Sequence, residues 1–155
     1  MKLQTGWEEV DKFEVAIRAP DNSVIGGTEN PFTVTLRSPR SDKIKNLTAR
    51  HAEERAAFFE SIPKPDRADT PLPNDIAERH SVELVQAAHV AWNNVPEIVE
   101  ELQDGEQRVV EIDDFESEAF AKFLRENNDY AQQITKAWTN KKNLHRRTQE
   151  PAKNS

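Results

Sequence analysis

Two short runs near the start of the chain alternate apolar and polar positions. Phe13, Val15 and Ile17 are separated by polar or small residues, and residues 32–36 repeat the alternation. A period of two is typical of a β-strand with one buried face. The turn-rich residues between the runs predict that the strands pair as an antiparallel hairpin within residues 10–38. Because two strands are marginal in water, we expect a third strand, a helix or another subunit to cover one face.

Residues 39–61 change to a helical spacing of apolar positions. Ser38 is expected to cap this helix, with Pro39 in the first helical position. The apolar stripe is incomplete, with alanines in the gaps, and it contains Ile44, Leu47, His51, Phe58 and Ile62. Residues 62–74 hold four prolines. They are predicted to form an extended linker, because proline interrupts regular structure.

The helical spacing returns in residues 75–94, where Asp75 is the expected N-cap and Asn93-Asn94 the expected stop. The apolar side of this predicted helix carries Leu84, Val85, Ala88 and Trp92. The Asp104-Gly105 pair then predicts a turn. It is expected to join a strand at residues 98–99 to a strand at residues 109–112.

Two amphipathic helices are predicted in residues 115–147, with a break at Asn127-Asn128. The apolar face of the first holds Phe115, Ala119, Phe120, Phe123 and Leu124, and that of the second holds Tyr130, Ile134, Ala137 and Trp138. Because the break is short, the helices are expected to pack as a helical hairpin. Residues 148–155 are polar and are predicted to be a disordered tail.

These elements predict an α+β fold that is mainly α. A small N-terminal antiparallel β-hairpin is followed by about four helices, and the last two form the helical hairpin. Residues 1–147 are expected to be a single domain, with the β part at 10–38, a helix at 39–61, the linker at 62–74 and the helical part at 75–147.

The composition indicates a thin core, or one that a partner completes. Hydrophobic residues make up 35% of the chain and charged residues 32%, against ~45–50% and ~25% in ordinary globular chains. The absence of cysteine excludes disulfides and thiol chemistry and favours a reducing cytosol. With no signal-peptide run and no apolar stretch near ~20 residues, we expect a soluble intracellular protein that does not interact with a membrane.

The charge is unevenly distributed. The net charge of −7 disfavours nucleic acid as the main partner, because phosphate binding requires a surplus of Lys and Arg. Residues 95–118 contain ten acidic residues and one basic residue, whereas residues 136–155 contain six basic residues and one acidic residue. This polarity is compatible with self-association in multiple copies, although two solvated faces are the simpler interpretation.

No catalytic or metal-binding motif stands out. The histidines form no HExxH pair, and His80 and His89 fall on opposite sides of one predicted helix. We interpret all four as core-edge or surface residues. The acidic pairs lack the apolar surroundings that raise the pKa of a carboxylate, and there is no GxSxG turn or Gly-rich phosphate loop. We therefore expect no enzymatic activity, no cofactor and no metal.

The aromatic residues are the clearest candidates for partner contacts. Trp92 and Trp138 each close a predicted helical stripe. Core packing is the first interpretation of both, and an exposed groove anchor is the alternative. Trp7 lies in a polar segment and is the best single candidate for a contact outside the domain. The basic residues at 141–147 fit a helix C-terminus better than an RNA contact.

The order of elements resembles a known family. The segments that carry the resemblance are PFTVTLRSPRSDKIKNLTARH, VELVQAAHVAWNNV and GEQRVVEIDDFESEAFAKFLRENNDYAQQITKAWTNKKNL. They are similar to the tail assembly chaperones of long-tailed, non-contractile bacteriophages, in which an alanine-rich helix with a Trp leads through an acidic Gly-containing turn and a strand to a helical hairpin. The matching positions are Ala87-Ala88, Trp92, Gly105, Phe115, Phe120, Phe123, Leu124, Ile134 and Asn143-Leu144. The Pro-rich linker and Asn127-Asn128 depart from the family's pattern.

The resemblance implies a non-enzymatic protein of the host cell cytoplasm. It would keep the long helical tape measure protein soluble, help recruit tail tube protein and be absent from the mature virion. In this interpretation the C-terminal hairpin packs on the helix that carries Trp92, and apolar surface left exposed binds the client. The candidate partner-binding residues are Trp7, Trp92, Phe120, Phe123, Ile134 and Trp138.

Two alternatives remain open. The protein is a permanent virion component, such as a tail completion or connector subunit, if it is present in purified particles. It is an acidic decoy for a nucleic-acid-binding protein if its carboxylates are spaced like phosphates on a rigid surface, for which residues 97–118 look too rich in loops.

Overall fold

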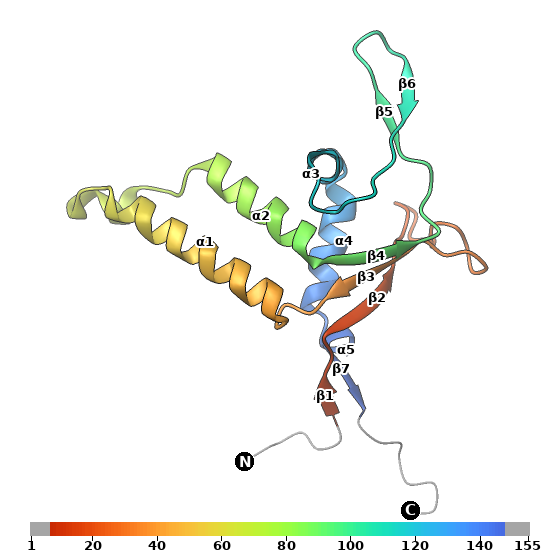
Figure 1. Ribbon diagram of the computed structural model, residues 1–155, viewed down its shortest axis with the longest axis horizontal. Coiled ribbons are helices and arrows are strands. Elements are labelled where there is room, and N and C mark those ends of the chain that lie inside the picture. Colours follow the sequence, from red (N-terminus) through yellow and green to blue (C-terminus); the bar gives the residue numbers. More distant parts are fainter. Residues whose placement is uncertain (1–6, 148–155) are drawn as a thin grey trace, which may run out of the picture.

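A computed structural model describes residues 7–147. It is 46% helical and 20% strand, which confirms the predicted α+β class. A small sheet packs on helices; a helical arm extends from it to one side, and two short β-ribbons lie at opposite ends (Figure 1). The elements in chain order are β1 (Trp7–Glu9), β2 (Lys12–Ala16), β3 (Thr33–Arg37), α1 (Asp42–Glu60), η1 (Lys64–Asp69), α2 (Asn74–Ala88), β4 (His89–Asn93), β5 (Val99–Glu101), β6 (Gln107–Val109), α3 (Glu118–Glu126), α4 (Asn128–Thr139), α5 (Lys141–Leu144) and β7 (His145–Arg147).

The central sheet has the strand order β2-β3-β4 and is antiparallel throughout. The predicted hairpin of β2 and β3 is confirmed, with Val15 opposite Val34. A third strand was one of the expected ways to complete it, and β4 supplies that strand. Val34 and Leu36 on the middle strand are completely buried. The main core lies between this sheet and the helices α2, α3 and α4.

The predicted helix at residues 75–94 was too long. Helix α2 ends at Ala88, and His89 already has an extended backbone, with φ −75° and ψ 128°. Residues 89–93 pair instead with β3, where Trp92 lies opposite Val34. The hydrogen-bonding groups along β3 require a partner on each side. This demand, which arises from a strand more than fifty residues away, overrides the local helical pattern.

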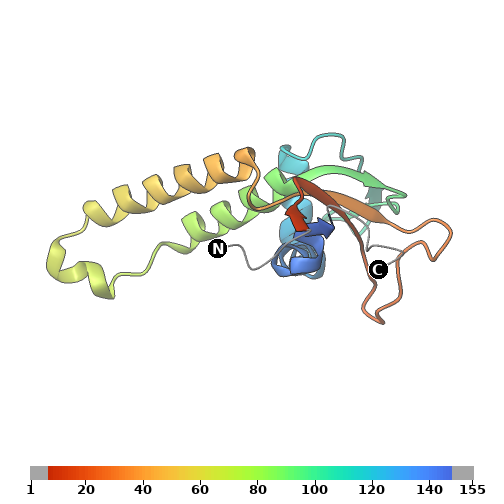
Figure 2. The ribbon, with the colours of Figure 1, turned by 90° about the horizontal axis from the view of Figure 1, so that it is seen from below.

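The helices α1 and α2 lie side by side and form the arm that extends from the sheet (Figures 1 and 2). The predicted first helix is confirmed, but its N-cap is Ser41 and not Ser38. Ser38 is buried, and its hydroxyl accepts a hydrogen bond of 3.2 Å from the backbone N–H of Arg40. The helix begins after Ser38 because Ser38 still extends the pairing of the middle strand β3 with the residues before β2, and its own N–H donates to the carbonyl of Asp11.

The Pro-rich segment between these helices is not entirely irregular. A 3₁₀ helix, η1, occupies part of it, with proline in its first turn. Proline is tolerated there because the first N–H groups of a helix have no internal acceptor. The Arg67 guanidinium donates to the carbonyl of Ile62 at 2.8 Å, and the Thr70 hydroxyl donates to that of Asp66 at 2.7 Å.

The predicted hairpin around Gly105 is confirmed. Strands β5 and β6 pair antiparallel, with Val99 opposite Val109. Gly105 has a φ of +83°, a left-handed conformation that glycine adopts without strain. The turn is closed by a hydrogen bond of 2.7 Å from the N–H of Leu102 to the carbonyl of Glu106. This β5–β6 ribbon projects from the top of the molecule in Figure 1.

Helices α3 and α4 both form, with only Asn127 between them. They are shorter than the predicted span of residues 115–147, because α3 begins at Glu118 and α4 ends at Thr139, where α5 and β7 follow. The Ser117 hydroxyl caps α3 by accepting the N–H of Phe120 at 3.1 Å. Figure 1 shows α3 along its axis and α4 from the side, so the two helices are steeply inclined to each other. They form a helical corner, and the prediction of a helical hairpin with antiparallel helices is wrong. Both helices still bury their apolar residues in one core, and Phe115 reaches that core from the loop before α3.

The two ends of the described chain meet in a ribbon that the sequence did not predict. Strand β1 pairs antiparallel with β7, with Glu8 opposite Arg146. Their side chains form an ion pair of 2.5 Å between Oε1 and Nε. The N–H of Val10 continues the ribbon by donating to the carbonyl of Leu144 at 2.9 Å. The predicted tail at residues 148–155 lies outside the described residues.

Candidate protein-binding surface

The centre of the core is an aromatic cluster around His89. The ring of His89 contacts those of Phe115, Phe120 and Tyr130, with centroids 4.7–5.8 Å apart. Nδ1 of His89 lies 2.6 Å from the carbonyl of Val85, which can only accept, so Nδ1 carries the proton. Nε2 then accepts the hydroxyl of Tyr130, also at 2.6 Å. Burial lowers the pKa of His89 to about 4, which keeps the ring neutral.

Two of the six predicted contact residues are sealed in this core. Phe120 is 0% exposed and Ile134 1%. Neither can reach a partner while the domain is folded, so the prediction that they form a contact surface is wrong. Their apolar helical spacing was interpreted correctly, but periodicity alone does not distinguish a face that meets another protein from one that meets the domain's own sheet.

Trp92 and Trp138 are half-buried and have structural partners. Trp92 packs on Phe32, with centroids 5.9 Å apart, from a strand and not from a helix. The indole N–H of Trp138 donates to the carbonyl of Arg37 at 2.8 Å. The Arg37 guanidinium in turn donates to the carbonyls of Ala87 and His89. These bonds join α4, β3 and the end of α2, in agreement with the core interpretation of both indoles.

Of the two remaining predicted residues, Phe123 is half-buried like the two indoles, and Trp7 is exposed. Phe123 lies on α3 at the edge of the aromatic cluster, 6.1 Å from the ring of Trp92. Trp7 is on β1 and is 47% exposed. Phe123 lies on α3, which packs beside α2 and α4, whereas Trp7 lies on β1 at the lower end of the molecule (Figure 1). The six predicted residues therefore do not form one surface.

An apolar cleft opens beside Phe123, and we define it as two adjoining hollows of about 240 and 320 Å³. The two hollows share Ile98, Val99, Phe123 and Asn127. The α3 wall is a helical stripe formed by Ala119, Lys122, Phe123 and Glu126. The opposite wall is the base of the β5–β6 ribbon, and its apolar residues are Ile98, Val99, Val110 and Ile112.

The second hollow of the cleft is bounded by the loop after β2. Its apolar lining adds Ile17, Ile25, Phe32, Pro96 and Tyr130. The loop is held against α4 by the side-chain amide of Gln133, which accepts the N–H of Arg18 and donates to its carbonyl. The two bonds measure 2.9 and 2.8 Å. The cleft therefore has walls from the ribbon, both corner helices and this loop.

Charged side chains surround the cleft, with more carboxylates than cations. The acidic residues that line it are Glu97, Glu100, Glu118, Glu126 and Asp129, and the basic residues are Arg18, Arg108 and Lys122. Glu100 forms ion pairs with Lys122 and Arg108. Hydrogen bonds from these two cations, Lys122 first, lower the pKa of Glu100. This ion-pair cluster ties α3 to the ribbon.

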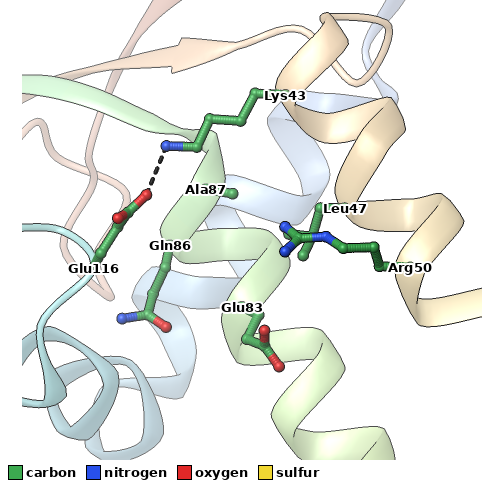
Figure 3. Close-up of a pocket in the computed structure, with 7 residues that line it drawn as sticks. All are labelled: Lys43, Leu47, Arg50, Glu83, Gln86, Ala87 and Glu116. Carbon is green, nitrogen blue, oxygen red and sulfur yellow. Dashed lines mark hydrogen bonds and ion pairs between the residues drawn. The ribbon is translucent and has the colours of Figure 1, made fainter. Parts of the chain in front are cut away.

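A separate pocket lies between α1 and α2, and its lining is mainly polar (Figure 3). Lys43 of α1 reaches Glu116, and their Nζ and Oε1 atoms are 2.7 Å apart. Leu47 and Ala87 are the apolar part of a lining that is otherwise charged or amide-bearing. None of the residues that line this pocket is a serine, threonine or histidine.

Two buried histidines meet between α1 and α2. The rings of His51 and His80 are stacked, with centroids 3.9 Å apart, and each is 5% exposed. Nε2 of His80 is 2.8 Å from Oε2 of Glu54, and Nε2 of His51 is 3.8 Å from Oε2 of Glu83. Each helix therefore contributes one His-x-x-Glu pair. Spacing along one helix does not reveal this contact, because His51 lies on α1 and His80 on α2.

The protonation of this group follows from its surroundings. Burial lowers the pKa of His51, and the neighbouring His80 and Arg55 lower it further, against the opposing effect of Glu83. Hydrogen bonds from Arg79, and then from His80, lower the pKa of Glu54 to about 2. The stacked rings direct their Nε2 atoms to different carboxylates. Among residues 7–147, no three His, Asp or Glu side chains converge in a way that could hold a metal ion.

Comparison of the chain with protein-family models, curated proteins and solved structures gave no match in any of the three. Within the part of the chain that the structure describes, no helix has the length and apolar content to cross a bilayer.

Proposed function

We propose that this protein is a non-enzymatic tail assembly chaperone that binds the tape measure protein in the host cytoplasm and helps recruit tail tube protein. One observation supports the proposal most directly: the apolar cleft beside Phe123 is open to solvent and is lined by five carboxylates and three cations. This cleft is the binding surface in the proposal. The client in this proposal is taken from the family resemblance, and the cleft is the surface that would bind it.

The chemistry of the cleft fits an exposed apolar stripe on a long helix. Such a stripe aggregates in water, and covering it with apolar side chains removes the driving force. Ile98, Val99 and Phe123 are partly exposed residues that can provide this cover. Carboxylates around the cleft can pair with Lys or Arg beside the stripe, and the remaining negative charge repels other coated clients.

The size of the cleft fits reversible binding. Hollows of about 240 and 320 Å³ accept a few side chains each, below or near the lower limit of the ~300–1,000 Å³ of pockets that enclose a whole ligand. Each copy thus buries a small area. A chaperone that must leave the client before tail maturation requires such weak individual contacts, repeated along the client.

The proposal is tested by co-expression with the neighbouring tape measure protein. Ala119→Arg introduces a long cationic side chain into the cleft from an exposed position on α3. We expect the wild-type chain to raise the soluble fraction of the tape measure protein several-fold, and Ala119→Arg to abolish most of that effect. The matched control is Ala52→Arg, at an exposed position on α1 away from the cleft.

Equal insolubility of the tape measure protein with and without the wild-type chain would rule out the chaperone function. Equal activity of Ala119→Arg and Ala52→Arg would rule out the cleft as the binding surface. Detection of the protein in purified virions by mass spectrometry would favour the alternative of a tail completion or connector subunit.

A further inference from the structure

The large apolar residues exposed on this molecule gather at two opposite ends. Within residues 7–147 they are Trp7, Val99 and Val109, which are 47%, 46% and 56% exposed. Trp7 lies on the β1–β7 ribbon, and the two valines face each other across the β5–β6 ribbon. Figure 1 shows the ribbons at the bottom and the top of the molecule. Each ribbon has two strands in the described structure.

The β5–β6 end is acidic. Glu101, Asp104 and Glu106 are exposed at or near its turn, and none of them forms an ion pair with another described residue. The nearest cation, Arg108, is engaged by Glu100. This end therefore presents two exposed valines together with uncompensated negative charge.

The β1–β7 end carries the opposite charge. Lys12, Lys141 and Lys142 are exposed there and form no ion pair within the described chain. Arg146 is compensated by Glu8. Asp11 is also exposed at this end, which therefore has three cations without an ion pair and one such carboxylate. Together with the exposed indole of Trp7, this end presents apolar area and positive charge.

We propose that copies of this protein associate head to tail, with the β5–β6 ribbon of one copy docked on the β1–β7 ribbon of the next. Each end combines exposed apolar area with one sign of charge, and the signs are complementary. Like ends repel, so a symmetric dimer through either end is disfavoured. Docking unlike ends gives a heterologous contact, which builds a ring or an open filament.

The strand edges make this contact more favourable. An isolated two-stranded ribbon is marginally stable in water, and an unpaired edge accepts a further strand. Lateral approach of the two ribbons would satisfy backbone groups on both sides, while the valines and the indole lose their exposure to water. The contact concerns two copies of the same chain and does not depend on the identity of any client.

The test measures the mass of the full-length chain, 17.7 kDa as a monomer, by sedimentation velocity over a range of concentrations. At an ionic strength of ~0.01 M, where charges act over ~30 Å, we expect species larger than the monomer that grow with concentration. At ~1 M, where the screening length is ~3 Å, we expect the association to weaken by about tenfold or more. A monomer at every concentration at low ionic strength overturns the proposal and assigns the two ends to other partners.

Charge reversal identifies the contacting ends. D104K/E106K reverses the hairpin end, and K141E/K142E reverses the other end. We expect either variant alone to be monomeric, and the variant with all four substitutions to associate again. Assembly that persists in either single-end variant, or that fails to return in the fourfold variant while its circular dichroism and unfolding temperature match the wild type, overturns the head-to-tail contact.

Matched controls place the same charge changes on the arm. E53K/E60K and K45E/K64E alter exposed residues of α1 and η1 that have no ion pair within the described structure. We expect both to associate as the wild type does. Because no client is present, failure here leaves the proposed chaperone function untouched, and failure of the co-expression test leaves this contact untouched.

Discussion

The hydroxyl of Tyr130 donates a 2.6 Å hydrogen bond to Nε2 of His89 in the centre of the core. Nδ1 of the same imidazole is occupied by the carbonyl of Val85, so both ring nitrogens have partners. A buried polar ring is tolerated only when it is satisfied in this way. The bond joins α4 to the first residue of β4, at the point where the predicted helix turns into a strand.

The neutral state of His89 predicts acid sensitivity. Its pKa is about 4 in the fold and ~6.5 in the unfolded chain. Between these two pKa values the unfolded chain binds a proton that the folded chain excludes. The unfolding free energy is therefore highest above the pKa of the unfolded chain and falls as the pH drops below it. We expect the unfolding free energy to decrease by up to ~1.4 kcal/mol per pH unit from this group. Urea denaturation between pH ~7 and ~5 measures it, above the range in which carboxylates titrate.

Tyr130→Phe tests the same bond at neutral pH. The substitution leaves Nε2 of His89 buried without a donor, which costs ~1–3 kcal/mol. Urea denaturation near pH ~7.5, where the ring is neutral in both states, gives the value. A change below ~0.5 kcal/mol would contradict a bond that matters for stability.

His51→Phe is expected to reduce the acid sensitivity of the arm. The phenyl ring preserves the stack on His80, and no hydrogen bond is lost because Nε2 of His51 has no hydrogen-bond partner in the described structure. The lowered pKa of His51, like that of His89, makes the unfolding free energy fall as the pH drops. The variant removes the contribution of His51. The slope of stability against pH should become shallower between pH ~7 and ~5. Ala52→Phe, at an exposed position on the same helix, should leave the slope as in the wild type.

Trp138→Phe removes one defined hydrogen bond. The carbonyl of Arg37 loses the indole N–H that donates to it at 2.8 Å. We expect a loss of about 1–2 kcal/mol in the unfolding free energy, from the bond and from the smaller ring. Trp7→Phe, at a residue that is 47% exposed, should change the free energy by less than ~0.5 kcal/mol. Comparable losses in the two variants would contradict a structural role specific to Trp138.

Phe120→Ala separates a core residue from a surface residue. Phe120 is 0% exposed, so its truncation should destabilise the domain by ~3–5 kcal/mol. Val109→Ala, at a site that is 56% exposed, should cost less than ~0.5 kcal/mol. Denaturant unfolding of both variants makes the comparison. A small effect of Phe120→Ala would mean that the aromatic cluster is not the core of the fold.

Several elements were predictable because their signals are local. The alternation around Val15 and the turn at Gly105 depend on neighbouring residues, and both elements formed close to their expected positions. The cleft was only partly predictable. Phe123 was named and its opposite wall was recognised as a hairpin, but nothing in the sequence indicated that the two face each other.

Contacts between distant segments account for the errors. Trp92 was assigned to a helix because residues 75–94 continue a helical spacing, and the need of β3 for a second partner reversed that assignment. The stacking of His51 on His80 brings together residues on two helices, and spacing within one helix does not reveal it. The β1–β7 ribbon joins the two ends of the described chain, and neither end has a strong strand pattern.

By itself the sequence determined the types of most elements, their turns and the separation of acidic from basic segments, because these depend on residue type and short-range spacing. Only the tertiary structure decided which apolar faces are sealed and which stay exposed. Burial depends on which surfaces meet: Phe120 and Trp7 are both aromatic, yet one is at the centre of the core and the other is at the surface. The fold also places the acidic β5–β6 ribbon and the basic α5–β7 segment at opposite ends of the described chain.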